Sequence, residues 1–290
     1  TMERKIKMSE ENINNEENNI EEVKEERNNE LNMRISGVHN INDATREEDL
    51  QKAIDNRTRF DVGDMFRVDT LKFFADGTFS MIEPYVETAA AIGKTPGTRE
   101  PLLWDEQHML ESMVAGNEAG FNLHTHSMGS YSTKKVVDCY IEAQRQHPSE
   151  SIRNIVAHCT FVSNEDRIRM GQNHIIASNQ PGWFSDHPVI EPVYVSLWGE
   201  DVVEETYPCK SMIDNGVINA FGSDYAVNIP YGLSGLQVAM TRVSVHKDDT
   251  YEQYPAGQNG HHRGLPRLLP DRTVHQAPRS HQGRLCRRTV

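Results

Sequence analysis

The stretch Asn122-Leu123-His124-Thr125-His126 places two imidazoles two residues apart at the end of an apolar run. Successive side chains of a β-strand point to opposite faces, so His124 and His126 are expected to share one face with Asn122. Two imidazoles on one face can bind a metal ion or move protons. A pair of polar residues at a strand end is the plainer interpretation, and this motif alone does not exclude it.

Three further residues of this kind fall in comparable places. Lys72 lies in the apolar run 66–74, His158 lies near the end of the run 152–161, and Asp224 follows the run 217–221. Zinc prefers histidine nitrogen and carboxylate oxygen as ligands. A metal also lowers the pKa of a bound water, which then supplies a hydroxide that can attack a substrate. A hydrolytic metal centre is therefore one interpretation, and a plain α/β scaffold with satisfied polar groups in its core is the other.

The elements that would position these residues alternate between strands and helices from Leu31 to about Asp224. Strands are expected at 31–35, 66–74, 122–126, 152–161, 174–178 and 217–221, and helices at 46–56, 105–119, 133–146, 165–170 and 210–215. This alternation predicts βα units on a parallel sheet. In a βα barrel the carboxyl ends of the strands carry the active site.

The two ends of the chain differ in composition from its middle. Residues 1–30 are rich in Glu and Asn, and residues 251–290 carry seven Arg and no Lys against Glu252 and Asp271. We expect a disordered or frayed acidic lead over 1–30, with a helix near 18–29, a globular domain over 31–245, and an irregular basic tail over 246–290. The net charge of −13 divides into −18 for residues 1–250 and +5 for residues 251–290, and the acidic body argues against nucleic acid or an anionic membrane as the main partner.

The four cysteines are far apart and form no C-x-x-C pair, so neither a thiolate zinc site nor a redox dithiol is expected. Cys159 directly follows His158 and is expected on the opposite face of the same strand. No apolar segment approaches the roughly 20 residues that span a bilayer. We expect a cytoplasmic protein with reduced thiols that acts on a small molecule.

Five short motifs occur in order: L-K-F-F-A-D-G at Leu71–Gly77, H-T-H-S-M-G at His124–Gly129, R-N-I-V-A-H at Arg153–His158, N-Q-P-G-W at Asn179–Trp183 and F-G-S-D-Y-A-V at Phe221–Val227. This set resembles the amidohydrolase superfamily, and within it the metal-dependent hydrolases called amidohydrolase family 3, or YtcJ-like. The resemblance covers about Leu31 to Arg242.

The resemblance implies a partial (β/α)8 barrel with one or two divalent metal ions, usually zinc, that hydrolyses a C–N bond of an amide-like substrate through a metal-activated water. By motif position, Lys72 matches a lysine that can be carbamylated to become a metal ligand, and His126 and His158 match histidine ligands. Asp224 matches an aspartate that is both a ligand and the group that activates water. The residues expected to line the substrate pocket are His124, Gln180 and Trp183.

The sequence also departs from the family pattern. A small β-sandwich and a first barrel strand with an H-x-H metal pair are expected before Leu31, and neither is found there. Ser130 stands where an Asp usually follows the H-x-x-G motif. We therefore expect a chain truncated at its N-terminus, with impaired activity and an exposed sheet edge that promotes self-association. The alternative is an inactive fragment or scaffold that acts only by binding a partner.

The tail departs as well. From His261 to Gly264 the chain reads His-His-Arg-Gly, and codons for these residues read one base later can encode Ile or Thr twice and then Val, as the family pattern would continue. We expect residues after about Gly260 to be an out-of-frame reading of the gene. A genuine basic tail that binds an acidic partner is the rival interpretation.

Overall fold

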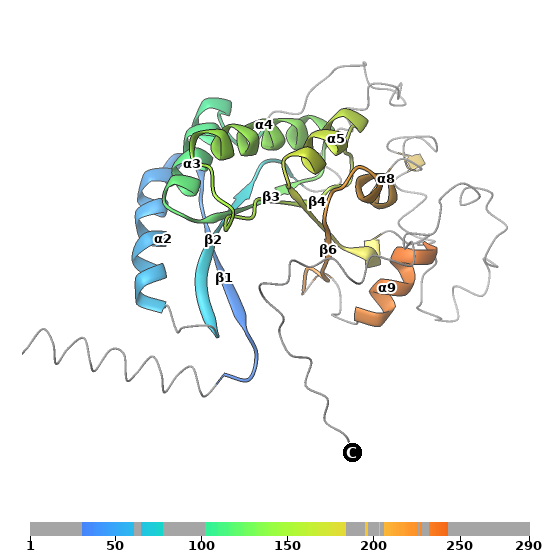
Figure 1. Ribbon diagram of the computed structural model, residues 1–290, viewed down its shortest axis with the longest axis horizontal. Coiled ribbons are helices and arrows are strands. Elements are labelled where there is room, and N and C mark those ends of the chain that lie inside the picture. The colour runs from blue at the N-terminus through green and yellow to red at the C-terminus, as the bar shows by residue number, and fades with distance from the viewer. Residues whose placement is uncertain are drawn as a thin grey trace, which may run out of the picture.

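A six-stranded parallel sheet forms the framework of the chain (Figure 1). The computed structural model describes residues 31–60, 65–77, 102–183, 195–196, 203, 206–225, 227 and 232–242. Neighbouring strands pair in chain order, and every pair is parallel. The strands are β1 (Ile35–Asn40), β2 (Phe66–Phe74), β3 (Asn122–Ser127), β4 (Ile155–His158), β5 (Ile176–Asn179) and β6 (Asn219–Phe221). The predicted α/β class with βα units is confirmed.

Helices connect these strands and cover the sheet, as parallel pairing requires. Figure 1 shows α2, α3, α4 and α5 on one side of the sheet, while α9 packs against the 3-10 turn η2. The helices are α2 (Arg46–Phe60), α3 (Glu106–Glu118), α4 (Ser130–Gln146), α5 (Asn164–Gln172), α8 (Cys209–Asp214) and α9 (Gly232–Thr241), and the 3-10 turns are η1 (Asp43–Thr45) and η2 (Pro181–Trp183).

Local sequence sets the limits of α3. The Asp105 side chain accepts hydrogen bonds from the backbone N–H groups of Gln107 and His108, at 3.0 and 3.1 Å, so it caps the free donors of the first turn. Gly120 follows the helix with φ +80°, a conformation that glycine adopts without strain. The predicted range of 105–119 is therefore confirmed to within a residue at each end.

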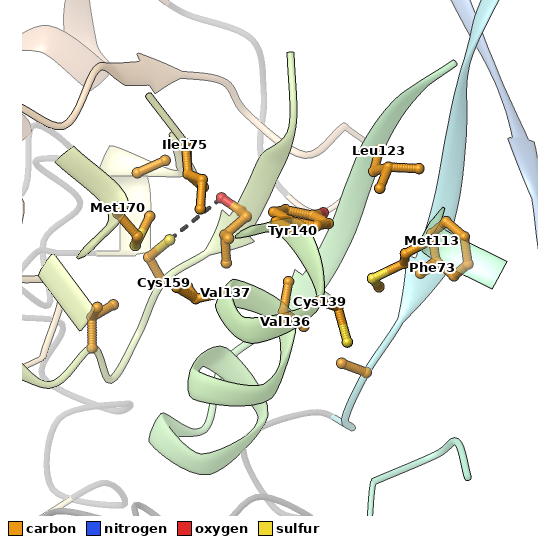
Figure 2. Close-up of a cluster of buried hydrophobic side chains, with 14 of the residues drawn as sticks. Phe73, Met113, Leu123, Val136, Val137, Cys139, Tyr140, Cys159, Met170 and Ile175 are labelled. Carbon is orange, nitrogen blue, oxygen red and sulfur yellow. Dashed lines mark hydrogen bonds between the residues drawn. The ribbon is translucent and has the colours of Figure 1, made fainter. Parts of the chain in front are cut away.

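The core lies between the sheet and its helices. Leu71, Phe73 and Leu123 are fully buried on the helix side, and Figure 2 shows Tyr140 of α4 packed in this cluster. Helix α3 approaches the strands closely at Gly116, where a Cβ atom would lie 2.8 Å from Leu71 Cδ1. Because side chains alternate along a strand, Lys72 and the two histidines of β3 are left for the other face.

Several boundaries differ from the predictions. The strand predicted at 31–35 is wrong in position, because β1 begins at Ile35, and the strand predicted at 152–161 is only four residues long in β4. The helix predicted at 133–146 starts earlier than expected, because α4 begins at Ser130. Helix α9 was not predicted, since its glycines and serine lower helix propensity. The acidic lead and the whole of the basic tail lie outside the described residues. No described helix is long and apolar enough to cross a membrane.

Replacing Tyr140 with Phe tests the core. The Tyr140 hydroxyl is fully buried, hydrogen-bonds with Thr125 Oγ1 at 2.6 Å and lies 2.9 Å from the Ile155 carbonyl oxygen. The substitution leaves both partners without that hydroxyl, so we expect the free energy of unfolding to fall by about 1–3 kcal/mol in urea denaturation. Tyr225→Phe is the matched control, because Tyr225 is 79% exposed. Equal free energies of unfolding for the two variants would contradict a stabilising role for the buried Tyr140 hydroxyl.

Candidate metal centre

The predicted site residues lie at or near the carboxyl ends of four strands of the parallel sheet. Lys72 is on β2, His126 is on β3, His158 is the last residue of β4, and Asp224 follows β6. In the β2–β3 register Lys72 is opposite His124, and in the β3–β4 register Ser127 is opposite His158. The parallel order of the strands therefore brings residues far apart in sequence to one edge of the sheet.

His126 and His158 lie against each other at this edge. Their ring centroids are 4.4 Å apart in an edge-to-face arrangement, and the two residues are only 8% and 5% exposed. Phe74 lies on the far side of His126, with ring centroids 5.3 Å apart. The structure thus pairs the two histidines that the sequence proposed as metal ligands.

Hydrogen bonds define which nitrogen of each ring carries the proton. His126 Nε2 lies 2.9 Å from the carbonyl oxygen of Gly77, which can only accept, so Nε2 bears the proton and Nδ1 keeps a lone pair. His158 Nδ1 lies 2.7 Å from Oε1 of Gln180, so in His158 the proton is on Nδ1 and the lone pair is on Nε2. Each ring therefore offers one nitrogen as a metal donor.

Burial lowers the pKa of two imidazoles at this edge, His124 and His158. Desolvation, helped by His126, lowers the pKa of His158 to about 3. Desolvation and the nearby Lys72 ammonium lower the pKa of His124 to about 4. A histidine must be neutral to bind a metal. With this low pKa, the donor nitrogen of His158 already carries no proton at pH 7.

His124 is engaged with Lys72. The Lys72 ammonium donates to His124 Nδ1 at 3.0 Å and lies 4.9 Å from the ring centre of Phe74. Burial lowers the pKa of Lys72 to about 8, and the negative charge of Asp224 opposes that fall. Asp224 is itself exposed, and its carboxylate is near enough to act on the Lys72 amine.

Two strand ends adopt backbone conformations that are rare for residues with side chains. His158 and Cys159 have φ of 77° and 48°, and Asp224 has φ of 53°. Such left-handed conformations cost of order 1–3 kcal/mol each and concentrate at functional sites. They also break the alternation of side chains at the strand ends. The directions of the His158 imidazole and the Asp224 carboxylate depend on these backbone conformations.

Cys159 lies in the core and not at the site. Its thiol donates to the Val156 carbonyl oxygen at 3.3 Å, drawn as the dashed line in Figure 2, and the residue is fully buried. Burial raises the pKa of the Cys159 thiol well above its usual value, which makes it a poor nucleophile. The expectation that Cys159 faces away from the histidine site is confirmed.

Gln180 and Trp183 both contact His158. Gln180 is 4% exposed and accepts from His158 Nδ1, and the Trp183 ring stacks on the imidazole with centroids 5.0 Å apart and an interplanar angle of 15°. The structure therefore gives both residues a role in holding His158. Their predicted role in binding substrate, like that of His124, stays a prediction.

The donor chemistry fits a divalent metal, although the described side chains do not enclose one. No three His, Cys, Asp or Glu side chains gather into a ready-made metal group within the described ranges. Two neutral imidazoles are the donors that zinc and similar ions prefer. Ser130 Oγ at the start of α4 and Asn179 Oδ1 at the end of β5 are buried and have no hydrogen-bond partner among the described residues, so a bound group can still pair with them.

Sequence reasoning missed one buried carboxylate next to the site. Asp76 follows β2, is 5% exposed, and has Oδ1 3.3 Å from His126 Nε2. The signal was present in the A-D-G sequence at the end of the strand, which was interpreted only as a turn. Gly77 was missed for the same reason, because its contribution to the site is a backbone carbonyl.

Comparison with known proteins agrees with this architecture. The sequence model of the amidohydrolase family matches residues 8–277. Protein LONG AFTER FAR-RED 3 of Arabidopsis thaliana is 24% identical over 178 residues, which cover 60% of this chain and 29% of that protein. The putative amidohydrolase YtcJ of Bacillus subtilis is 26% identical over 186 residues, which cover 62% of this chain and 32% of that protein.

A solved structure shows the same fold. An uncharacterized metal-dependent hydrolase from Pyrococcus furiosus superposes with a TM-score of 0.52 at 18% identity, over 67% of this chain and 40% of that chain. The fold is thus part of the barrel of metal-dependent hydrolases. The chain belongs to the amidohydrolase family, which implies a divalent metal, and it spans about a third of the length of the curated relatives it matches.

The proton positions of the two histidines can be measured. In the metal-free protein with 15N-labelled histidine, we expect two-bond proton–nitrogen correlations to show the Nε2–H form for His126 and the Nδ1–H form for His158. The acceptors Gly77 O and Gln180 Oε1 impose these forms. His174 is exposed to solvent, so it provides the reference spectrum of a histidine whose ring is not held by a buried acceptor. The same tautomer in both buried rings would contradict the assignment.

Proposed function

We propose that this chain carries part of the active site of a hydrolase that cleaves C–N bonds in amide-like small molecules with the help of a divalent metal, zinc being the first choice. The observation that carries the proposal is the buried pair His126 and His158, two imidazoles whose ring hydrogen bonds each occupy one nitrogen and leave the other as a metal donor. Family membership supports the class of reaction. Because the chain spans about a third of its curated relatives, the activity of the whole protein belongs to this proposal.

His126, His158, Lys72 and Asp224 are the residues that would hold the metal. When bound, the metal supplies Lewis acidity, which lowers the pKa of water and polarises a substrate carbonyl. Lys72 suits the role of a carbamylated ligand, because burial lowers the pKa of its amine to about 8 and so raises the neutral fraction that can react with carbon dioxide. His124 holds that amine in place through its Nδ1.

Asp224 is proposed to move the proton. As a carboxylate it can accept a proton from the attacking water and pass it to the departing amine nitrogen, which general acid–base catalysis requires. Its strained backbone aims the residue from the end of β6, and its charge acts on Lys72. Trp183, stacked on His158, limits the access of bulk water to that ring. We further propose that Gln180 and Trp183 border the substrate.

Metal content tests the histidine pair. We expect His126→Asn and His158→Asn each to lose most of the divalent metal that the purified chain binds, measured by mass spectrometry of the metal, because each removes one donor nitrogen. His174→Asn is the matched control, since His174 is exposed with φ of 54°, a conformation that Asn tolerates. Unchanged metal content in both site variants would contradict the proposal.

Asp224→Asn separates proton transfer from metal binding by the histidines. Asn keeps the shape and the left-handed backbone of Asp224 but cannot take a proton, so we expect hydrolysis of N-acyl amine probes to fall by roughly 100-fold or more. Amine release from the probes and metal content are measured on the same sample. Asp214→Asn, at an exposed position of α8, is the matched control. Full amine release by the Asp224 variant would exclude it as the proton carrier.

A further inference from the structure

The Asp76 carboxylate ties the end of β2 to the start of α4. Its Oδ2 accepts from the backbone N–H groups of Gly129 and Met128, at 2.7 and 2.9 Å, and from the Ser132 hydroxyl. Its Oδ1 lies 3.1 Å from the Met128 nitrogen. Gly129 has no side chain with which to cap α4, so Asp76 supplies an acceptor from another part of the chain.

The same carboxylate reaches His126 through its other oxygen. Asp76 Oδ1 is 3.3 Å from His126 Nε2, while the Gly77 carbonyl oxygen is 2.9 Å from that nitrogen. Two consecutive residues therefore present acceptors to one N–H group. Asp76 and His126 are both more than 90% buried, so water does not compete for the contact.

We propose that Asp76 is a positioning residue for His126, which fixes the ring and keeps the proton on Nε2 so that Nδ1 stays free as a donor to the metal. The value of this arrangement for metal binding rests on the proposed function. Partners of this kind, which hold the second nitrogen of a ligand histidine, orient the ring and raise its basicity.

The two oxygens of Asp76 make its two roles separable. Ser132 and Gly129 bind Oδ2, and Oδ1 is the oxygen 3.3 Å from His126 Nε2. Loss of the Ser132 hydroxyl therefore weakens the tie to α4 and leaves the oxygen that faces His126 in place. Ser132→Ala is the matched control for a role of Asp76 in the helix start alone.

Asp76→Asn is the test variant. The N–H groups of Met128 and Gly129 claim the single oxygen of the new amide, so its NH2 group takes the place of Oδ1 and points a donor at His126 Nε2. The Gly77 carbonyl still accepts from Nε2–H, so we expect an Nδ1–H form of His126 to appear beside the Nε2–H form in the two-bond proton–nitrogen spectrum of the metal-free protein. Because Nδ1 must then lose a proton to bind metal, we expect the dissociation constant for Co2+ alone to rise roughly 10–100-fold.

The control distinguishes positioning from a purely structural role. Ser132→Ala should keep the Nε2–H form of His126 and the Co2+ affinity of the unaltered chain. The proposal would be overturned if His126 stayed wholly in the Nε2–H form in Asp76→Asn and the Co2+ affinity did not change. Equal changes in the His126 spectra of Asp76→Asn and Ser132→Ala would also overturn it. If the unaltered chain binds no Co2+, the proposed function fails, and the tautomer spectra still decide the role of Asp76.

A second measurement covers the case in which Asp76→Asn does not fold. The carboxyl 13C resonance of Asp76 is followed in the unaltered chain and in His126→Gln, which leaves every donor on Oδ2 in place. We expect the resonance to move, because the imidazole N–H beside Oδ1 is lost. An unmoved resonance would overturn the contact on which the proposal depends.

Discussion

Burial of His126 and His158 at the strand ends is the constraint on which the site depends. A buried ring N–H without an acceptor costs about 1–3 kcal/mol, so each imidazole must donate a hydrogen bond from its N–H group to a fixed acceptor. Gly77 and Gln180 supply those acceptors from β2 and β5, on either side of the two histidines. The hydrogen bond that each ring makes with its acceptor also determines which ring nitrogen stays free to bind a metal. Stability and metal chemistry therefore depend on the same hydrogen bonds.

The fold supports this arrangement through strand register and helix packing. Leu71 and Leu123 fill the core on the helix side, and Gly116 lets α3 approach them closely. A shift of one residue in β3 would turn Leu123 to the site and His124 into the core, which the packing against α3 forbids. The core thus fixes the face on which Lys72 and the histidines lie. Chemistry at one face is positioned by apolar packing at the other.

The sequence predicted the parts of this picture that depend on local pattern. Alternation in 122–126 placed His124 and His126 on one face, and apolar runs located β2 and β3 with their limits nearly correct. It did not predict that His124 bonds Lys72, because that contact depends on side-chain packing between β2 and β3. The pairing of His126 with His158 followed only from the family resemblance. Asp76 was missed because its partners, His126 and the start of α4, are about fifty residues away along the chain.

The most direct test of the account is the coordination of a metal bound to the unaltered chain. X-ray absorption at the cobalt edge, recorded on protein loaded with Co2+, counts imidazole ligands through their multiple-scattering pattern. The account predicts two imidazole nitrogens, from His126 and His158, and the loss of one in either His→Asn variant. A spectrum with no imidazole contribution, or one that neither variant changes, would contradict the claim that this buried pair is a metal centre.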